Sequence, residues 1–313
     1  MFFYLLRRLA ATVPVLVVVA LIVFLMLRLA PGDPAAAIVG DNATPDAIVK
    51  VRHQLGLDRS LPVQFVIWGS ALLKGNLGDS YFMKVGVTTL IGQRIQPTIS
   101  LSVVTLFFTV LIAVPLGILA AWRHGGWLDR CLMTFSVLGF SVPSFVIGYL
   151  LIWYFALHLK WLPVAGYISI QHGLWPWFHS LILPAITLSI IYVALIARVT
   201  RAAVAEALQE DYIRTARAKG ISELRVLFRH ALANAAIPIV TVIGLGIALL
   251  IGGVVVTESV FAIPGLGQLT VDAVLSRDFP LIQGITLFFS VIYVLINLAV
   301  DLSYLVFDPR IRY

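Results

Sequence analysis

The sequence predicts an all-α membrane protein that crosses the bilayer six times. Of its 313 residues, 60% are apolar and only 12% are charged, and the mean hydropathy is +1.00. Ordinary soluble domains carry about 25% charged residues, so this composition favours a membrane protein. The apolar residues gather into six runs, and the basic residues gather at the ends of those runs. Both patterns are typical of a chain with several transmembrane helices.

We expect one span at each apolar run. The runs are Leu9–Leu27, Thr98–Ala121, Leu132–Leu157, Leu181–Ala197, Ala235–Val256 and Leu281–Val306. The first run is longer than the apolar region of a cleaved signal peptide, which has about 7–15 residues. Residues 1–30 are therefore expected to form a retained first transmembrane helix. The fourth run is long enough to span only if its helix continues past Arg198.

The basic residues set the expected topology. Those on one side are Arg7, Arg8, Arg123, Arg130, the arginines from Arg198 to Arg229, Arg310 and Arg312. The short loops on the other side carry only Lys160 and Arg277. Because cytoplasmic loops are enriched in Lys and Arg, we expect both termini on the cytoplasmic side of the cell (inner) membrane. The net charge of +7 then reflects contact with membrane lipid, and nucleic acid is not an expected partner.

Residues 31–97 are expected to form a compact extracytoplasmic cap. Their signals are a helix break over Pro31–Pro34, a helix start at Thr44 and Pro45, a helix stop at Gly56, and a second helix over Leu61–Leu73 that ends near Gly75. A segment of this length with helical signals of its own is usually functional, so we favour a cap over a passive linker. Residues 98–313 are left as a core of five helices.

No catalytic pattern stands out in the sequence. It has no phosphate-binding loop that ends in Gly-Lys, no Gly-x-Ser-x-Gly elbow and no His-Glu-x-x-His pair. The six histidines are scattered, and the single cysteine, Cys131, excludes an internal disulfide and a cysteine-based metal cluster. We therefore expect neither an enzyme nor a metal site, and the energy for any work must come from elsewhere.

Three features within the apolar runs have more than one interpretation. Ser290, Tyr293, Asn297 and Asp301 recur at spacings of three and four, which places them on one helical face. They either line a translocation path or bond to a neighbouring helix. Glu258, near the outer end of the fifth run, is expected to touch solute or water. The glycines of that run, Gly244, Gly246, Gly252 and Gly253, permit close helix packing or form a hinge or pore lining.

Residues 198–234 are too polar to cross a bilayer and are rich in helix-forming residues. We expect a helical hairpin on the cytoplasmic face. Its parts are a continuation of the fourth span to about Leu208, a short helix over Tyr212–Lys219 and a third helix over Glu223–Ala233. Asp211 and Ser222 are expected as N-caps, and Gly220 as the residue that ends the short helix.

The short helix has the features of a docking surface. It presents Tyr212, Thr215, Ala216 and Lys219 at helical spacing. Small side chains at Thr215, Ala216 and Ala218 allow another surface to approach, and Arg214 and Arg217 offer bidentate contacts to carboxylates. The alternative is a basic loop that is held to anionic lipid.

The same segment resembles a known signature. DYIRTARAKG at Asp211–Gly220, followed by His230, Leu232, Asn234 and Pro238, resembles the coupling loop of ABC-importer permeases, in particular the first-permease, or B, type of the dipeptide/oligopeptide (also glutathione, nickel and opine) permease family. The Glu-Ala-Ala triplet of that signature falls on Arg214, Thr215 and Ala216, so its Glu is absent here. The remaining stretches that resemble the family are LAPGDP at Leu29–Pro34, LGLD at Leu55–Asp58, GNLG at Gly75–Gly78, FAIPGLG at Phe261–Gly267 and DPR at Asp308–Arg310.

The resemblance covers essentially the whole chain and implies a type I ABC-importer permease fold. It implies a translocation path formed with a second, homologous permease subunit as a heterodimer. Two cytoplasmic ATPase subunits would bind ATP and Mg, so this chain would hold no cofactor. An extracytoplasmic solute-binding protein would dock over residues 31–97 and the 257–280 loop. The residues implied to couple to an ATPase subunit are Asp211, Tyr212, Arg214, Thr215, Ala216, Arg217, Lys219 and Gly220, and those implied to dock the binding protein are Glu258, Pro264 and Gly265.

The solute stays open at this stage. Members of this family import di- and oligopeptides, glutathione, nickel chelates and opines, and we expect a peptide or a glutathione-like solute. The rival from another class is an ion-driven secondary carrier, which would be expected to bury more carboxylates at mid-depth. A membrane enzyme is the third interpretation.

Overall fold

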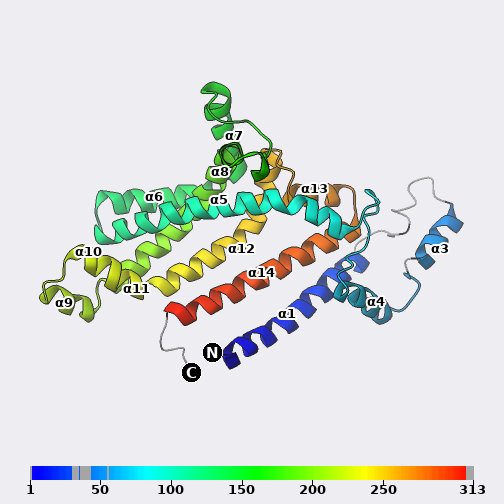
Figure 1. The fold of residues 1–313 in the computed structure, drawn as a ribbon, viewed down its shortest axis with the longest axis horizontal. Helices are drawn as coiled ribbons and strands as arrows, with labels where there is room; N and C mark the ends of the chain where they lie inside the picture. The colour runs from blue at the N-terminus through cyan, green and yellow to red at the C-terminus, as the bar shows by residue number, and fades with distance from the viewer. Residues whose placement is uncertain (1, 30–34, 36–43, 55, 308–313) are drawn as a thin grey trace. The chain divides into compact units, whose positions relative to one another are not determined.

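The computed structural model describes residues 2–29, 35, 44–54 and 56–307, and this part of the chain is helical apart from connecting loops and one isolated bridge between Asp79 and Gly86 (Figure 1). The first apolar run lies in α1 (Phe2–Leu29), as predicted. The predicted helix break over Pro31–Pro34 and the Asp308–Arg310 stretch lie outside the described residues.

Four helices of the described part are long and apolar enough to cross a membrane. They are α5 (Val87–Trp122), α8 (Leu174–Ala207), α12 (Ala236–Val260) and α14 (Phe279–Phe307). A fifth span is counted if the next two segments act as one: α6 (Trp127–Ser141), and α7 (Ser144–Leu151) with its π-helical continuation η1 (Ile152–His158). The described apolar part of α1 covers Ala10–Met26, which is shorter than these spans.

The span expected over Leu132–Leu157 is not one straight helix. The chain bends by 101° between Ser141 and Ser144. Val142 takes an extended conformation there (φ −97°, ψ 122°), and the next residue is Pro143. Proline has no backbone N–H and disfavours a helical conformation in the residue before it, which accounts for the break.

The chain forms two compact units. The first contains residues 96–267 and 295–313, and the second contains residues 2–95 and 268–294. In the first unit, α8 packs against α6, α7 and α12, and its buried side chains include Leu181, Leu188 and Ile196. The buried face of α6 recurs at helical spacing and carries Asp129, Leu132, Ser136 and Gly139. The helix expected to continue past Arg198 does so, since α8 ends at Ala207.

The glycines of α12 serve close packing in this unit. A methyl group on Gly244 would collide with Val300, and one on Gly253 would lie 2.8 Å from the Tyr192 hydroxyl. These contacts favour the packing interpretation of both glycines over a hinge or a pore lining.

A polar hairpin follows α8 and lies at one end of it (Figure 1). It consists of α9 (Asp211–Ala218), α10 (Glu223–Arg225), the π-helical η3 (Val226–Ala231) and α11 (Leu232–Asn234). Gly220 has a φ of +74°, so the predicted helix stop is confirmed. Ser222 takes the N-cap position of α10, as expected. The predicted N-cap of α9 was wrong by one residue, because Glu210 occupies that position and Asp211 begins the helix.

The second unit contains both helices predicted for the cap. They are α3 (Pro45–Gln54) and α4 (Leu61–Leu73), and the expected stops, Gly56 and Gly75, have φ values of +64° and +77°. The Phe24 ring of α1 contacts the rings of Phe65 and Trp68 on α4. The remaining elements of the described residues are the short η2 (Ile170–His172) in the first unit and α13 (Leu266–Leu275), which begins in the first unit and continues into the second.

Gly117 lies where α5 closely approaches α8. A Cβ atom on Gly117 would lie 2.7 Å from the Ala197 carbonyl oxygen and 2.7 Å from Thr200 Cβ. We expect Gly117→Ala to destabilise the first unit by about 1–3 kcal/mol, because two backbones would have to move apart. Thermal unfolding of the purified protein in detergent measures this effect.

Gly92→Ala is the matched control on the same helix. A Cβ atom there would meet nothing within 4 Å, so this substitution should leave the melting temperature unchanged or slightly higher. Equal melting temperatures for both variants would contradict the close approach at Gly117.

Candidate functional site

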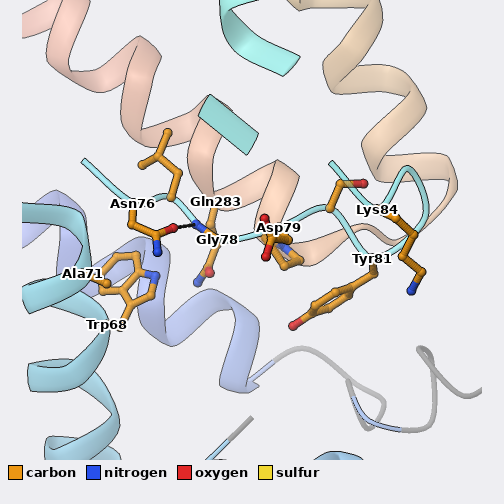
Figure 2. Close-up of a pocket in the computed structure, with 11 residues that line it drawn as sticks. Trp68, Ala71, Asn76, Gly78, Asp79, Tyr81, Lys84 and Gln283 are labelled. Carbon is orange, nitrogen blue, oxygen red and sulfur yellow. Dashed lines mark hydrogen bonds between the residues drawn. The ribbon is translucent and has the colours of Figure 1, made fainter. Parts of the chain in front are cut away.

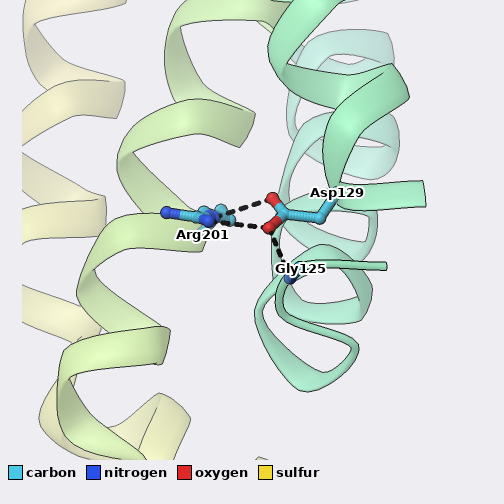
Figure 3. Close-up of polar contacts among 3 residues, drawn as sticks. All are labelled: Gly125, Asp129 and Arg201. Atoms are coloured by element: carbon cyan, nitrogen blue, oxygen red, sulfur yellow. Dashed lines mark hydrogen bonds and ion pairs between the residues drawn. The ribbon is translucent and has the colours of Figure 1, made fainter. Parts of the chain in front are cut away.

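A buried ion pair joins α6 to α8 near the polar hairpin. The Arg201 guanidinium donates from Nε to Asp129 Oδ1 at 2.8 Å and from Nη2 to Asp129 Oδ2 at 2.7 Å (Figure 3). The Gly125 amide donates to the same Oδ2 atom at 2.9 Å. The Asp129 side chain is only 6% exposed and that of Arg201 21%. Three donors thus hold one carboxylate and fix the loop before α6 against α8.

Sequence reasoning did not single out this pair. Asp129 lies among basic residues at the start of an apolar run, where an acidic side chain is unusual. It also shares the helical face of Leu132 and Ser136, which predicts that it points inward. These two signals indicate a buried acid that needs a cationic partner, but they do not identify Arg201, which lies 72 residues later.

The inner face of α9 belongs to a small apolar core. Ile213 and Ala216 are buried with Val204 of α8 and with Val226 and Leu227 of η3. Ala216 was expected on the presented surface, and that placement is wrong because it points inward. The predicted coupling residues that lie exposed are Asp211, Tyr212, Arg214, Thr215, Arg217, Lys219 and Gly220. The exposed surface of α9 is therefore mainly polar and is carried on an apolar support.

The two arginines of α9 differ in their surroundings. Arg217 donates from Nε and Nη2 to the two carboxylate oxygens of Glu223, at 2.8 and 3.1 Å, and so bridges the turn at Gly220. Arg214 donates to Asp211 Oδ1 at 3.2 Å, and both of these side chains are highly exposed, at 77% and 94%. The Arg217 guanidinium is thus engaged by Glu223 of the same chain. The Arg214 guanidinium is more exposed, so it is available to a partner protein.

Tyr212 adds a neutral polar group to the same surface. Partial burial, and then the nearby Glu210 carboxylate, raise the pKa of the Tyr212 phenol above its usual value, while a hydrogen bond with Asn234 lowers it. A tyrosine is protonated near neutral pH in any case, and the raised pKa moves the phenol further from ionisation. Lys219 follows at the C-cap of α9, where a cation complements the helix dipole.

The other end of the first unit contains a buried carboxylate. Glu258 of α12 is completely buried and accepts hydrogen bonds from Thr98 Oγ1 at 2.6 Å and from the Gly267 amide at 2.7 Å. The expectation that Glu258 touches solute or water is therefore wrong. Of the other residues expected to dock a binding protein, Pro264 is half-buried and Gly265 is buried.

The polar stripe of the last span lies on α14, as its spacing predicts. Tyr293 and Asn297 are exposed, Ser290 and Asp301 are half-buried, and Ser290 Oγ donates to the Thr286 carbonyl at 2.7 Å. Tyr304 continues this face, and its hydroxyl lies 2.8 Å from Thr241 Oγ1 of α12. At this end of the stripe the face bonds to a neighbouring helix. A role in lining a path remains a prediction for the four residues.

A cavity of about 490 Å³ that is lined by both polar and apolar side chains lies in the second unit (Figure 2). Its lining includes Trp68, Asn76, Asp79, Tyr81, Lys84 and Gln283. The loop along one side is fixed by Asp278, a carboxylate that is 1% exposed and accepts from Ser80 Oγ at 2.5 Å and from the Tyr81 amide at 3.2 Å. Sequence reasoning placed Asp278 only within the 257–280 loop, and no local pattern links it to Ser80.

Two family models match the chain. Residues 113–313 match the "binding-protein-dependent transport system inner membrane component", and residues 1–102 match the N-terminal region of such a membrane component. The chain belongs to this family. It is therefore a multi-pass component of the inner membrane and a transport subunit rather than an enzyme.

Curated relatives align along almost the full length. A "probable peptide ABC transporter permease protein" of Sinorhizobium fredii is 56% identical over 310 residues, which is 99% of each chain. A "putative peptide transport system permease protein" of Brucella abortus is 42% identical over 308 residues, or 98% of each chain. The glutathione transport system permease protein GsiC of Salmonella typhi is 44% identical over 310 residues, or 99% of each chain. The predicted resemblance to ABC-importer permeases is thus confirmed.

A solved structure shares the fold. In an inward-facing crystal form of the MetNI methionine ABC transporter, one chain matches with a TM-score of 0.56 at 19% identity, and the match covers 70% of this permease and 96% of that chain. At this identity the match supports the helical permease fold alone.

The Asp129–Arg201 pair generates a test of stability. We expect Arg201→Ala to destabilise the permease by about 2–4 kcal/mol, because it leaves a buried carboxylate without its bidentate partner. The double variant Asp129→Ala/Arg201→Ala should be more stable than Arg201→Ala alone, since it removes the orphaned charge. Thermal unfolding of the four proteins of this cycle gives the interaction energy. A double variant as unstable as the sum of the two single variants would exclude the coupling.

Proposed function

We propose that this permease forms half of the translocation path of an ATP-driven importer for peptides, either di- and oligopeptides or a glutathione-like solute. The proposal draws its solute class from the printed names of relatives at 42–56% identity over nearly the full chain. The observation that carries its mechanism is α9, a short helix with an exposed polar surface on a buried apolar support. Such a helix suits the transfer of force from a separate protein.

The assembly that we propose contains this permease, a homologous second permease, two cytoplasmic ATPase subunits and an extracytoplasmic solute-binding protein. The family description names transport that depends on a binding protein, which supports the last of these partners. ATP and Mg would be bound by the ATPase subunits, and this chain would hold no cofactor. Residues 31–97 and the 257–280 loop would face the binding protein, and residues 98–313 would form the core.

The topology in this proposal has six spans with both termini in the cytoplasm. The spans are α1, α5, the bent pair α6 and α7 with η1, α8, α12 and α14. This order places α9 on the same side as both termini. It also places the Glu258 end of the first unit on the extracytoplasmic side, because α12 leads away from the hairpin.

Force would reach the path through α8. ATP-driven approach of the two ATPase subunits would move the exposed surface of α9, and the buried contacts of Ile213 and Ala216 would carry that movement to α8 and η3. The Asp129–Arg201 pair would then carry it to α6. Because packed helices move as rigid bodies rather than deforming, the displacement would reach the membrane-spanning part of the unit.

Two alternatives remain distinct from this proposal. An importer of the same family for nickel chelates or opines would use the same coupling and differ only in solute. An ion-driven secondary carrier would need no ATPase subunit. The two buried carboxylates of the first unit that are described here, Asp129 and Glu258, are fixed in hydrogen bonds, which favours structural roles over proton relay.

Transport by the reconstituted importer tests the proposal, with Gly220→Val as the diagnostic variant. Vesicles that contain ATP but no ion gradient should take up a dipeptide in the presence of the binding protein. Gly220→Val should reduce this uptake at least about tenfold, because a β-branched residue is costly at a φ of +74° and would change the end of α9. Uptake of radiolabelled dipeptide per permease measures both effects.

Gly220→Asn is the matched control, since Asn tolerates the left-handed conformation far better. A Cβ atom at this position would meet nothing within 4 Å, so both variants have room for this atom and differ chiefly in how well they tolerate the left-handed backbone. Uptake that depends on an ion gradient and proceeds without ATPase subunits would contradict the proposal and would favour the ion-driven secondary carrier. Normal uptake by Gly220→Val would contradict the coupling role of α9.

Arg214 is the arginine that we expect to contact an ATPase subunit. Arg214→Glu should weaken co-purification of the ATPase subunits about tenfold, because a charge-assisted contact would become a repulsion. Arg217→Glu should act in another way, through loss of the bridge to Glu223. The double variant Arg217→Glu/Glu223→Arg restores this bridge with its charges exchanged, so it should recover the association lost in Arg217→Glu. The corresponding exchange Arg214→Glu/Asp211→Arg should not recover the association lost in Arg214→Glu. ATPase subunits that stay bound to Arg214→Glu would exclude this contact.

A further inference from the structure

Three segments of the first unit meet at the buried Glu258 carboxylate. Glu258 lies two residues before the end of α12, Thr98 belongs to α5, and Gly267 lies in the first turn of α13. Thr98 Oγ1 donates to Glu258 Oε1 at 2.6 Å, and the Gly267 amide donates to Glu258 Oε2 at 2.7 Å. The Leu266 amide donates to Thr98 Oγ1 at 2.8 Å. One acidic side chain thus connects two long helices with the start of a third.

The direction of these hydrogen bonds suits a carboxylate. A backbone amide can only donate, so the Leu266 amide takes a lone pair of Thr98 Oγ1 and leaves the hydroxyl hydrogen for Glu258. The Leu266 and Gly267 amides also lie in the first turn of α13, and a negative charge is stabilised at the N-terminus of a helix. The Glu258 main chain adds a further link, because its carbonyl accepts from the Ile263 amide at 2.9 Å.

The glycines of the following loop leave room for this carboxylate. A Cβ atom on Gly265 would collide with both carboxylate oxygens of Glu258. A Cβ atom on Gly267 would lie 2.9 Å from Glu258 Oε2 and 2.5 Å from Val255 Cα. The loop over residues 261–267 therefore packs directly against the Glu258 carboxylate. Glycine is required at positions 265 and 267 because the backbone lies too close to this carboxylate for a side chain, not because the loop is flexible.

The same loop exposes a small, fixed tip. Phe261 and Ile263 are buried, and the Phe261 carbonyl accepts from the Gly166 amide at 2.8 Å. Between them, Ala262 is exposed and has a φ of +48°, and Pro264 is half-buried. A non-glycine residue in this conformation costs about 1–3 kcal/mol and persists where the surroundings hold it, which is typical of functional loops.

We propose that Glu258 is a positioning residue that holds the 261–267 loop in the one conformation to which the extracytoplasmic binding protein docks. This inference rests on the proposed function. Glu258 does not touch the partner; Ala262 and Pro264 do. Because these side chains are small and uncharged, the tip fits an apolar recess on a folded protein surface. A loop already fixed before docking loses little conformational entropy when the complex forms, and this raises affinity.

The stimulation of ATP hydrolysis by the binding protein tests this role. The assembled importer is reconstituted with its ATPase subunits, and the ATPase rate is measured against the concentration of binding protein loaded with a dipeptide. Glu258→Ala should raise the half-saturating concentration about tenfold, equivalent to ~1.4 kcal/mol, and leave the maximal rate unchanged. Glu258→Gln should rescue most of the loss, because its amide oxygen can accept from Gly267 and its amide nitrogen can donate to Thr98 Oγ1.

A second pair of variants tests the same contact from α5. Thr98→Val removes both the donor and the acceptor and should raise the half-saturating concentration, whereas Thr98→Ser keeps the hydroxyl and should not. This pair decides the question if Glu258→Ala fails to assemble. Ser259→Ala is the neighbouring control, because Ser259 is exposed and its hydroxyl bonds only to the Val255 carbonyl of its own helix.

Two outcomes would overturn the inference. The first is an unchanged half-saturating concentration in the Glu258→Ala and Thr98→Val variants when the wild-type importer is stimulated, which would leave the proposed function intact. The second is a lower maximal rate at an unchanged half-saturating concentration, which would place Glu258 in the transport cycle instead of docking. A wild-type importer that is not stimulated at all would refute the proposed function and this inference together.

Discussion

The cost of an unpartnered charge in apolar surroundings governs this structure. A carboxylate withdrawn from water is destabilising by several kcal/mol unless donors replace its hydration. Asp129, Glu258 and Asp278 are each less than 5% exposed, and each accepts at least two hydrogen bonds from another element or from a backbone loop. All three lie at or near a helix end. The donors that they need come from side chains of neighbouring helices and from backbone amides of loops and helix starts, which each acid then fixes in place.

The polar hairpin shows the complementary arrangement. Its charged side chains stay at the surface, where a single ion pair contributes little, and its stability comes from the apolar side chains of Ile213 and Ala216 on the opposite face. The result is a polar surface on a packed support. This division lets the exposed residues serve a partner while the buried ones keep the helix attached to α8.

The sequence predicted the local structure well where the local signal was strong. Gly56, Gly75 and Gly220 all have positive φ and end helices where expected, because glycine adopts this conformation at little cost. The 101° bend at Pro143 was not predicted, because hydropathy is continuous across it and helical periodicity does not show by how much a helix axis turns. Ala216 was misplaced because a small residue suits a buried contact as well as a docking surface. The partners of Asp129, Glu258 and Asp278 lie 72, 160 and 198 residues away, a separation that no local pattern encodes.

The unbroken length of α8 has a mechanical consequence. Its 34 residues rise by about 1.5 Å each, which gives a rod of roughly 51 Å whose buried side chains run from Ser180 to Ala207. Because α6, α7 and α12 pack against this rod, a shift of α8 has to be shared by its neighbours rather than absorbed within the helix. A push at the end near Arg201 is thus felt at the end near Leu181.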